Sequence, residues 1–350
     1  MSSFASWLEF LQTNRLQLVD GELMATSERA ASANTNTRLF ALTNMCTLQI
    51  EGEEAKKFLQ GQVTCDITNL SDYSAQYGAH CNAKGRVIFN FLACAKDDKV
   101  TLRCDASLED VARKSLGKYM VFSKAKYVPD SDIKLCIALK GDTCENIVSD
   151  IFGKAPSTFM ESIHSDDFTL IRTDDDVIEC WVSADKIEDY WLKLEPLCAI
   201  GATSEWRADE IRKGRVWINA DTTENFVPQT INLTQVGAVS FTKGCYTGQE
   251  VVARMQYLGK QKRHTYRAIA DIETIPKAGD KLFGEDTQQS IGEIVNVVPT
   301  DDFSYELLVC ILDSAYKSGE VYLESQKVTK LRFAPLPYAI TNEQEETSEA

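Results

Sequence analysis

One cysteine of the chain stands in a setting suited to chemistry. In the stretch FTKGCYTGQEVVAR, Cys245 follows Gly244 and comes just before an expected helix. Thr247 and Glu250 fit a capping box, in which each side chain bonds to the backbone N–H of the other residue at a helix N-terminus. Cys245 would then lie near the positive end of the helix dipole, with Lys243 close in sequence. Both effects favour a thiolate, the nucleophilic and ligand-binding form of cysteine.

Two interpretations of Cys245 are open from these residues. The thiol is either reactive or ligand-contacting, or it fills a tight turn between Gly244 and a buried Tyr246. No histidine forms an evident dyad with it. His80 and His264 lie near the segments of interest, and we expect each to be a structural or exposed residue rather than a catalytic base.

The size and composition of the chain indicate a globular protein of two or three domains. It has 350 residues, of which 44% are hydrophobic, whereas a single core seldom extends beyond about 250 residues. No apolar run reaches the roughly 18 residues of a membrane span. The N-terminal stretch MSSFASWLEFLQ lacks the basic region and apolar stretch of a secretory signal. We therefore expect a cytoplasmic protein that does not associate with membranes.

The eleven cysteines are scattered without CxxC spacing, and many lie inside apolar runs such as FLACAKD and LLVCILD. This usage suits a reducing compartment better than a disulfide framework. We expect no structural disulfide and no zinc or other metal site.

The formal net charge of −15 argues against nucleic-acid binding by the whole surface, because phosphate contacts need lysine and arginine. A local exception lies between Ser240 and Ala270, where six basic residues stand against the single acidic Glu250, a net charge of +5. We call these six the basic island: Lys243, Arg254, Lys260, Lys262, Arg263 and Arg267. They indicate either an anionic partner or an exposed helix end followed by a strand entry.

The order of the patterns predicts an α+β fold with a β-rich C-terminus. Two successive rounds of strands and helices predict two α+β units of related shape. After Lys262 the helical periodicity disappears, and short strands with turn signals predict a small all-β barrel or sandwich. The expected division is an N-terminal arm or linker at 1–37, a first α+β domain at 38–130, a second at 131–262 with possible interleaving of the two, a C-terminal β-barrel at 263–340, and an acidic disordered tail at 341–350.

Six separated motifs carry a resemblance to a known family. They are FLQGQVTCD at 58–66, AHCNAKGRV at 79–87, KYMVFSKAKYVPD at 118–130, FVPQTINL at 226–233, KGCYTGQE at 243–250 and PLPY at 335–338. In this order they resemble the YgfZ family of folate-binding, tRNA-modifying proteins, which is related to the T-protein (aminomethyltransferase) of the glycine cleavage system. The resemblance spans about residues 40 to 340.

The resemblance implies two ferredoxin-like α+β domains and a C-terminal β-barrel around a central folate channel. It implies tetrahydrofolate or a derivative as cofactor, a role in tRNA modification, and upkeep of iron–sulfur enzymes such as tRNA methylthiotransferases. The family's functional cysteine matches Cys245. Direct tRNA contact would involve Lys260, Lys262 and Arg263.

Candidate folate-binding residues follow from the same resemblance. Trp206, in TSEWRADEIRKG, matches a family tryptophan whose ring would stack on the ligand, with Ser204 as the helix cap. Arg207 and Arg212 would face a glutamate tail. Met45 stands where the family has a second tryptophan. The set of candidate folate contacts is Trp206, Met45, Lys243, Tyr246 and Arg207.

The family relationship leaves three classes of function: an accessory protein, a transferase, and a plain scaffold in which folate is incidental. The T-protein relatives are transferases that depend on an acidic residue near the reacting carbon. In AHCNAKGRV the turn supplies Asn82 and no aspartate or glutamate. We therefore expect a folate-binding accessory protein, with a folate-dependent aminomethyl or one-carbon transferase as the alternative.

Overall fold

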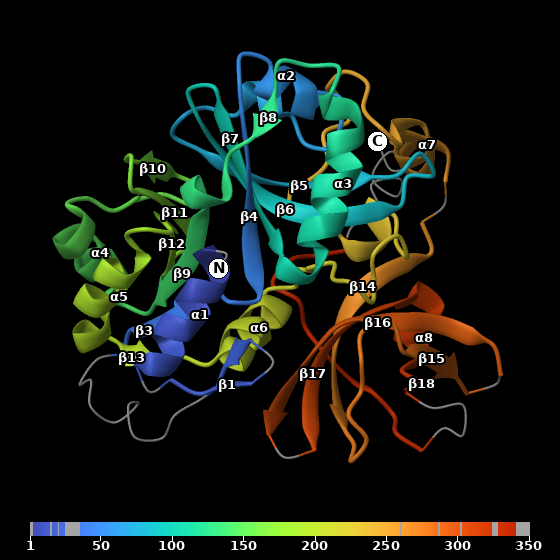
Figure 1. Ribbon diagram of the computed structural model, residues 1–350. Coiled ribbons are helices and arrows are strands. Elements are labelled where there is room, and N and C mark those ends of the chain that lie inside the picture. The colour runs from blue at the N-terminus through green and yellow to red at the C-terminus, as the bar shows by residue number, and fades with distance from the viewer. Residues whose placement is uncertain are drawn as a thin grey trace. The chain divides into compact units, whose positions relative to one another are not determined.

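The computed structural model of the protein describes residues 3–14, 16–19, 21–24, 36–259, 261–285, 288–301, 303–323 and 328–340. The chain divides into two compact units (Figure 1). Unit 1 comprises Met1–Gly61, Asp66–Tyr77 and Phe91–Trp206, and unit 2 comprises Gln62–Cys65, Gly78–Asn90 and Arg207–Ala350. Neither unit is continuous in sequence. The expected division into two α+β domains and a barrel stays a prediction.

Unit 1 contains a six-stranded sheet whose long strands are buried on both faces. The strand order is β10 (Ser162–His164), β11 (Phe168–Asp174), β12 (Val177–Ser183), β9 (Lys134–Lys140), β3 (Arg38–Ala41) and β13 (Ala199–Ile200). Neighbours pair antiparallel except β13 with β3. In β9 all but the two terminal residues are buried, and in β12 all but the last residue are buried. A strand buried on both faces needs apolar layers above and below it.

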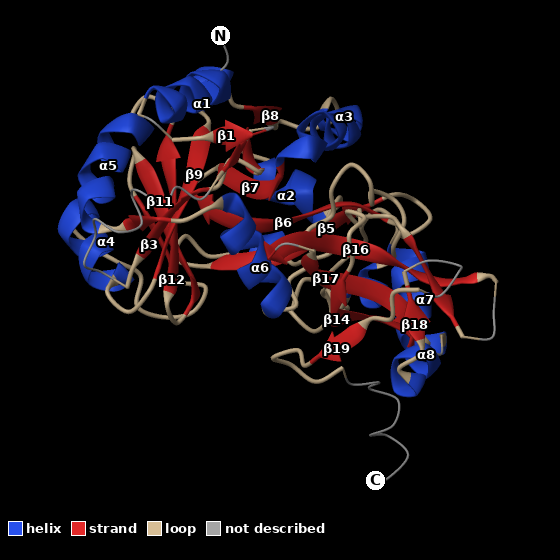
Figure 2. Ribbon diagram, turned by 90° about the horizontal axis from the view of Figure 1, so that it is seen from below, coloured by secondary structure: helices blue, strands red, loops and turns tan. Residues whose placement is uncertain are grey.

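Helices supply one of those layers. The helices α1 (Ser3–Thr13), α4 (Cys144–Phe152) and α5 (Ile187–Leu194) lie along one face of this sheet (Figure 2). In α1, Trp7 and Leu11 belong to the core, and the Trp7 ring meets Trp191 edge-on at 5.5 Å. The amphipathic start of the predicted N-terminal arm is therefore packed firmly. Residues 25–35 of the expected arm or linker lie outside the described residues.

A second sheet has the order β5 (Ala75–Cys81), β6 (Val87–Lys96), β7 (Lys99–Asp105), β4 (Met45–Glu51) and β8 (Lys126–Tyr127). It is accompanied by α2 (Ala55–Gln60) and α3 (Glu109–Met120). The turn of the AHCNAKGRV motif lies between β5 and β6. Residues of these two strands belong to both units.

The two sheets of unit 1 are joined by a buried ion pair. Arg103 on β7 donates to Glu179 on β12 at 2.8 Å, and the two side chains are 0% and 1% exposed. Trp181 Nε1 donates to the other carboxylate oxygen at 2.9 Å. Between β4 and the start of β9, Thr47 Oγ1 donates to the Lys134 carbonyl at 2.6 Å. Polar pairing of this kind fixes the spacing between two apolar layers.

The C-terminal part of unit 2 is a curled, half-barrel sheet with the order β18 (Val321–Tyr322), β15 (Lys281–Gly284), β16 (Ser290–Asp301), β17 (Ser304–Leu312), β14 (Arg263–Asp271) and β19 (Arg332–Ala334) (Figure 1). Two register shifts interrupt the β16–β17 ladder, and such bulges bend strands. The sheet wraps a core that includes Leu282, Ile294 and Leu307. A mixed α+β fold is therefore confirmed, whereas a closed barrel around a folate channel stays a prediction.

Several local predictions are corrected by the structure. Helicity does not end at Lys262, because α8 spans Asp313–Ser318. The helix α6 (Thr203–Arg212) starts at Thr203, so Ser204 lies inside it rather than at its cap. Thr203 instead uses its hydroxyl to accept from the Leu23 backbone at 2.9 Å. The predicted acidic tail at 341–350 lies outside the described residues.

The buried ion pair gives a first prediction. Replacing Glu179 with alanine leaves Arg103 buried without its carboxylate, and we expect a loss of about 3–5 kcal/mol in the free energy of unfolding. The measurement is urea denaturation followed by tryptophan fluorescence. As a matched control, Glu205→Ala removes a carboxylate that pairs with Arg38 at the surface, and its cost should stay below about 1 kcal/mol. Equal costs for the two variants would contradict this account of the interior.

Candidate functional site

Burial alternates along the loop that carries the candidate thiol. Lys243 and Tyr246 are each 7% exposed, whereas Gly244 and Cys245 between them are exposed. The loop is therefore held at both sides of the cysteine, and the thiol itself reaches solvent. This favours the first of the two interpretations, in which Cys245 is accessible to a reagent or ligand. The buried Tyr246 expected under the second interpretation is also present.

The side chain of Lys243 anchors this loop to an earlier segment of the chain. Its Nζ donates to the carbonyls of Val63 and Cys65, both at 2.7 Å. The same ammonium lies 5.1 Å from the centre of the Tyr246 ring, within the range of a cation–π contact. A lysine this buried needs such partners, because a desolvated ammonium without them is costly. Lys243 therefore acts as an anchor for the loop, which leaves its predicted role as a folate contact untested.

The segment beneath Lys243 is fixed by further bonds. Thr64 Oγ1 donates to the Ala238 carbonyl at 2.6 Å and accepts from the Ala79 backbone at 2.9 Å. The Ser240 backbone N–H donates to the Thr64 carbonyl at 2.9 Å. The short piece Gln62–Cys65 thus joins two distant parts of unit 2, the 238–246 loop and the start of the AHCNAKGRV motif.

The helix after the cysteine, α7 (Gln249–Leu258), starts later than predicted. Its N-cap is Gly248, with a φ of +85°, and no side chain caps it, so the capping box of Thr247 and Glu250 is wrong. A Cβ at Gly248 would lie 2.5 Å from the Asn82 carbonyl oxygen. One at Gly85, where φ is +69°, would lie 2.9 Å from the Val251 Cβ. Glycine is needed at both positions, because the NAKG turn rests directly on the start of α7.

The FVPQTINL motif ties α7 to the C-terminal sheet. Gln229 Nε2 donates to the Val252 carbonyl at 2.7 Å. Asn232 exchanges two hydrogen bonds with the backbone of Thr265 on β14 and also donates to the hydroxyl of Tyr338, which lies in PLPY. Motif residues from segments far apart in the sequence therefore meet within unit 2. The burial of Gln229 and Asn232, at 5% and 1% exposure, was not evident from the residues, since amides are ordinarily exposed.

Cys245 differs from the other thiols in its access to solvent. All eleven cysteines are free and lie within the described residues; Cys46 is half-buried, and nine are buried. Burial raises the pKa of Cys81 to about 12 and that of Cys310 to about 12, because the thiolate is poorly solvated there. These thiols stay protonated and covered at neutral pH. Cys245 is the cysteine that an external electrophile, metal centre or ligand can reach.

Two further candidates for folate contact are core residues of unit 1. Trp206 is 1% exposed and packs against Phe40, with ring centroids 5.5 Å apart. Its ring faces are covered, so stacking on a folate requires a rearrangement that the structure does not contain. Met45, at the start of β4, is 3% exposed. Arg207 is half-buried in α6, and Arg212 is paired with Glu306 rather than held for a glutamate tail.

The basic island is smaller on the surface than in the sequence. Besides the buried Lys243, Arg267 pairs with Glu306 at 2.8 Å, and Arg263 donates to the Ile291 carbonyl at 2.5 Å. Lys262 and Arg254 are exposed, whereas Lys260 lies outside the described residues. An anionic partner would therefore find fewer available cations than the count of six suggested.

Two buried polar atoms near the motifs have no hydrogen-bond partner within the described part of the chain. They are the Tyr246 hydroxyl and Gln229 Oε1. Burial also raises the pKa of Tyr246 above its usual range, so the phenol stays protonated. Buried polar atoms nearly always find partners in folded proteins, including water or a ligand. These two atoms are therefore candidate contacts for a polar ligand.

Sequence reasoning missed a carboxylate beside the NAKG turn. Asn82 Oδ1 accepts from the backbones of Lys84 and Arg86, and Nδ2 donates to Glu224 Oε1 at 3.0 Å. Glu224 is exposed and has a φ of +62°. It comes from a segment more than a hundred residues away, so no local pattern could reveal it. The turn therefore does have an acidic neighbour.

Other kinds of site were sought in the described residues. They contain no group of three or more histidine, cysteine, aspartate or glutamate side chains placed to hold a metal ion. None of the helices formed by these residues combines the length and apolar character needed to cross a membrane.

Comparisons with known proteins agree with the resemblance in the motifs. The chain is 28% identical over 325 residues to the tRNA-modifying protein YgfZ of Klebsiella pneumoniae, covering 89% of this chain and 96% of that one. It is 28% identical over 315 residues to the YgfZ protein of Escherichia coli, with the same coverage. The chain is thus related to proteins named YgfZ along most of its length. No family model matches it.

A solved structure shares the fold. The glycine cleavage system aminomethyltransferase T from Bartonella henselae superposes with a TM-score of 0.76 at 16% identity, covering 95% of this chain and 96% of that one. At this level of identity the likeness concerns the fold alone. The mixed α+β fold of this chain is therefore similar to that of this aminomethyltransferase T.

The contrast between Cys245 and the other thiols gives a second prediction. In the native protein, Ellman's reagent should modify one thiol per chain rapidly, and Cys245→Ser should abolish this fast phase. The other ten thiols should react only after unfolding, because they are not exposed. Rapid modification of the Cys245→Ser variant would show that a second thiol is accessible and contradict the prediction.

The glycines of the loop give a third prediction with its own control. Gly248→Ala forces a side chain into a left-handed conformation against the Asn82 carbonyl, and we expect it to lower the free energy of unfolding by about 1–3 kcal/mol. Gly244→Ala meets no atom within 4 Å and should cost less than about 0.5 kcal/mol. Thermal and urea unfolding of both variants make the comparison, and a tolerated Gly248→Ala would contradict it.

Proposed function

We propose that this relative of the YgfZ proteins acts in tRNA modification as a tetrahydrofolate-binding accessory protein whose working group is Cys245. In this proposal the protein functions in the cytoplasm and supports iron–sulfur enzymes such as tRNA methylthiotransferases. The names of its relatives support the tRNA-modification part. The fold shared with an aminomethyltransferase T supports a folate ligand.

The observation that carries the proposal is the placement of Cys245. Its thiol is the exposed one of eleven, and the loop around it is fixed by the buried ammonium of Lys243. Bonds from FVPQTINL hold the helix that follows it. A cysteine that only filled a turn would not require an exposed thiol in a loop fixed by this many bonds. Rigid presentation suits a group that must meet a partner in one orientation.

Two buried polar atoms of unit 2 suit hydrogen bonds to a polar ring ligand. The Tyr246 hydroxyl and Gln229 Oε1 offer a donor and an acceptor without partners in the described residues, and a pteridine presents both acceptors and donors along its edge. Arg207 would meet the carboxylates of the glutamate tail, because guanidinium groups bind carboxylates well. Trp206 and Met45 would contribute apolar contact once the Trp206 ring is uncovered.

A tRNA or an anionic partner enzyme would meet the exposed cations of the basic island. Lys262 and Arg254 are exposed, and Arg263 stands next to Lys262 in the chain. Arg263 would contribute less to this contact, because its guanidinium already donates to the Ile291 carbonyl. Changing Lys262 to glutamine should reduce both affinity for the partner and its salt dependence if the contact is with phosphates.

One observation favours the alternative, a folate-dependent aminomethyl or one-carbon transferase. The sequence places only Asn82 in the turn, but Glu224 brings a carboxylate to it. Such a carboxylate could serve the acid–base step that the T-protein relatives need. The accessory role remains the better supported proposal, because Glu224 already accepts from Asn82 and lies exposed to solvent rather than enclosed around a reacting carbon.

The fourth prediction tests folate binding. Tetrahydrofolate at about a hundred times its dissociation constant should stabilise the native protein by about 2.7 kcal/mol, because only the folded chain binds it. The measurement is the melting temperature under reducing conditions, with folate-free buffer as the reference. Cys245→Ser should keep this stabilisation, whereas Arg207→Gln should weaken it. The absence of any shift at saturating reduced folates would refute the folate part of the proposal.

The accessory and transferase roles separate in cells that lack the protein. If Cys245 serves tRNA modification, wild type restores the modified nucleosides and Cys245→Ser does not. Glu224→Gln distinguishes the roles: an accessory protein should tolerate it, and a transferase should lose its activity. Mass spectrometry of tRNA nucleosides provides the readout. Full restoration by Cys245→Ser would mean that the thiol has no part in the pathway.

A further inference from the structure

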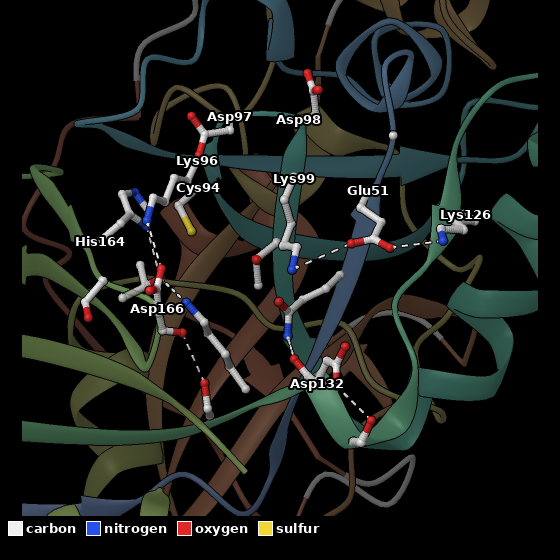
Figure 3. Close-up of a pocket in the computed structure, with 18 of the residues that line it drawn as sticks. Glu51, Cys94, Lys96, Asp97, Asp98, Lys99, Lys126, Asp132, His164 and Asp166 are labelled. Atoms are coloured by element: carbon white, nitrogen blue, oxygen red, sulfur yellow. Dashed lines mark hydrogen bonds and ion pairs between the residues drawn. The ribbon is translucent and has the colours of Figure 1, made fainter. Parts of the chain in front are cut away.

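Unit 1 contains a cavity of about 820 Å³ whose lining residues all belong to that unit. The cavity lies where strands β4, β6 and β7 of one sheet approach β9, β10 and β11 of the other (Figure 3). Its volume is that of a small-molecule site. The proposed function makes no use of it.

Lys134, at the start of β9, brings a primary amine to this cavity. The residue is half-buried, and its Nζ donates to Thr169 Oγ1 at 2.7 Å. No carboxylate among the described residues forms an ion pair with this amine. A lysine that is partly removed from water and lacks an ionic partner is in the setting where lysines act as nucleophiles.

The hydrogen bonds of Thr169 leave the lone pair of this amine available. Thr169 is 1% exposed, so its single O–H needs a buried acceptor. Within the described residues that acceptor is His164 Nδ1, at 3.1 Å, and the ring then donates from Nε2 to Ser162 Oγ at 3.0 Å. Burial and the nearby Lys134 lower the pKa of His164 to about 4, which agrees with a neutral ring. Thr169 therefore accepts from the amine and does not occupy its lone pair.

Burial also changes the charge state of the amine. It lowers the pKa of Lys134 to about 8; Lys99 and Lys96 act in the same direction, whereas Cys94 and Asp166 act in the opposite one. The neutral amine is the nucleophilic form of lysine. At neutral pH about one amine in ten is neutral at this pKa, against about one in 2,500 for an ordinary lysine.

The lining of the cavity is polar and has no excess of positive charge. Six carboxylates and four lysines line it, so an anionic ligand would gain nothing from the overall charge. The lining also supplies the hydroxyl groups of Thr101, Thr169, Ser131, Ser165 and Ser183. Hydroxyl groups both donate and accept hydrogen bonds, as the hydroxyl groups of a neutral ligand do. The lining therefore favours an uncharged polar ligand over an anion.

We propose that this cavity binds a small uncharged hydroxyaldehyde and that Lys134 reacts with it reversibly to form an imine. The Nζ lone pair attacks the carbonyl carbon and forms a C–N bond, which gives a carbinolamine. Both amine protons and the carbonyl oxygen then leave as one molecule of water, and a C=N double bond remains. Addition of water reverses the reaction, so no oxidant or reductant is required.

The reaction has a characteristic pH dependence. Only the neutral amine reacts, and lysine is neutral above its pKa, so the reaction of Lys134 accelerates as the pH rises through about 8 and then levels off. An exposed lysine, with the ordinary pKa of about 10.4, continues to accelerate to higher pH. Lys99→Met removes a cation that lowers the pKa of Lys134, so this variant should accelerate at a higher pH than wild type.

The fifth prediction tests Lys134 on the full-length protein with glycolaldehyde as the probe. A sodium borohydride quench after brief exposure reduces any imine to a stable secondary amine, and peptide mass spectrometry locates the adducts. At neutral pH we expect Lys134 to be labelled at least about tenfold faster than the exposed Lys57 on α2, because a larger fraction of its amine is neutral. The rate at Lys134 should saturate with aldehyde concentration, as expected for a ligand that binds before it reacts.

Two variants and a second probe complete the test. Lys134→Met should lose the fast adduct, whereas Lys57→Met, which removes an exposed amine outside the cavity, should keep it. The adduct map of the wild-type protein identifies the reacting amine even if Lys134→Met does not fold. Glyoxylate, a two-carbon aldehyde with a carboxylate, should show a smaller preference for Lys134 over Lys57 than glycolaldehyde does. The proposal is overturned if Lys134 reacts no faster than Lys57, if its rate does not saturate, or if glyoxylate shows the larger preference.

Discussion

A buried ammonium holds the candidate site together. Lys243 bonds to two carbonyls nearly two hundred residues earlier in the chain and lies against the ring of Tyr246. Because a desolvated lysine is costly without such partners, the loop has one well-satisfied position. Cys245 is held in that position by its neighbours, although its own side chain makes none of the anchoring contacts. Residues on either side of the thiol are thus responsible for where it points.

The close approach of the NAKG turn to α7 adds a second constraint on the same loop. Gly85 and Gly248 both adopt left-handed conformations, and a side chain at either would collide with the opposite segment. Gln229 and Asn232 then connect this junction to the helix and to the C-terminal sheet. The motifs that carry the resemblance to the YgfZ proteins are therefore largely a set of packing and hydrogen-bonding requirements around one exposed sulfur.

Sequence periodicity was sufficient for most of the secondary structure and insufficient for the site. The alternation of strands and helices and the β-rich C-terminus follow from apolar patterns, which depend on local geometry. The cap of α7 was mistaken because a tertiary contact with Asn82 decides it, and Thr247 has a suitable side chain only in isolation. Glu224 was missed for the same reason, because residues that meet only in the folded chain leave no local pattern in the sequence.

The assignment of Gln62–Cys65 to unit 2, while both flanking segments belong to unit 1, has a consequence for biosynthesis. The carbonyls that receive Lys243 leave the ribosome early, but the lysine itself emerges only after two-thirds of the chain has been made. Closing so long a loop has an entropic cost, and contacts between residues this far apart in sequence slow folding. The loop around Cys245 therefore cannot adopt its native conformation until most of the chain has been translated. A fragment that ends before Lys243 would lack this anchored loop.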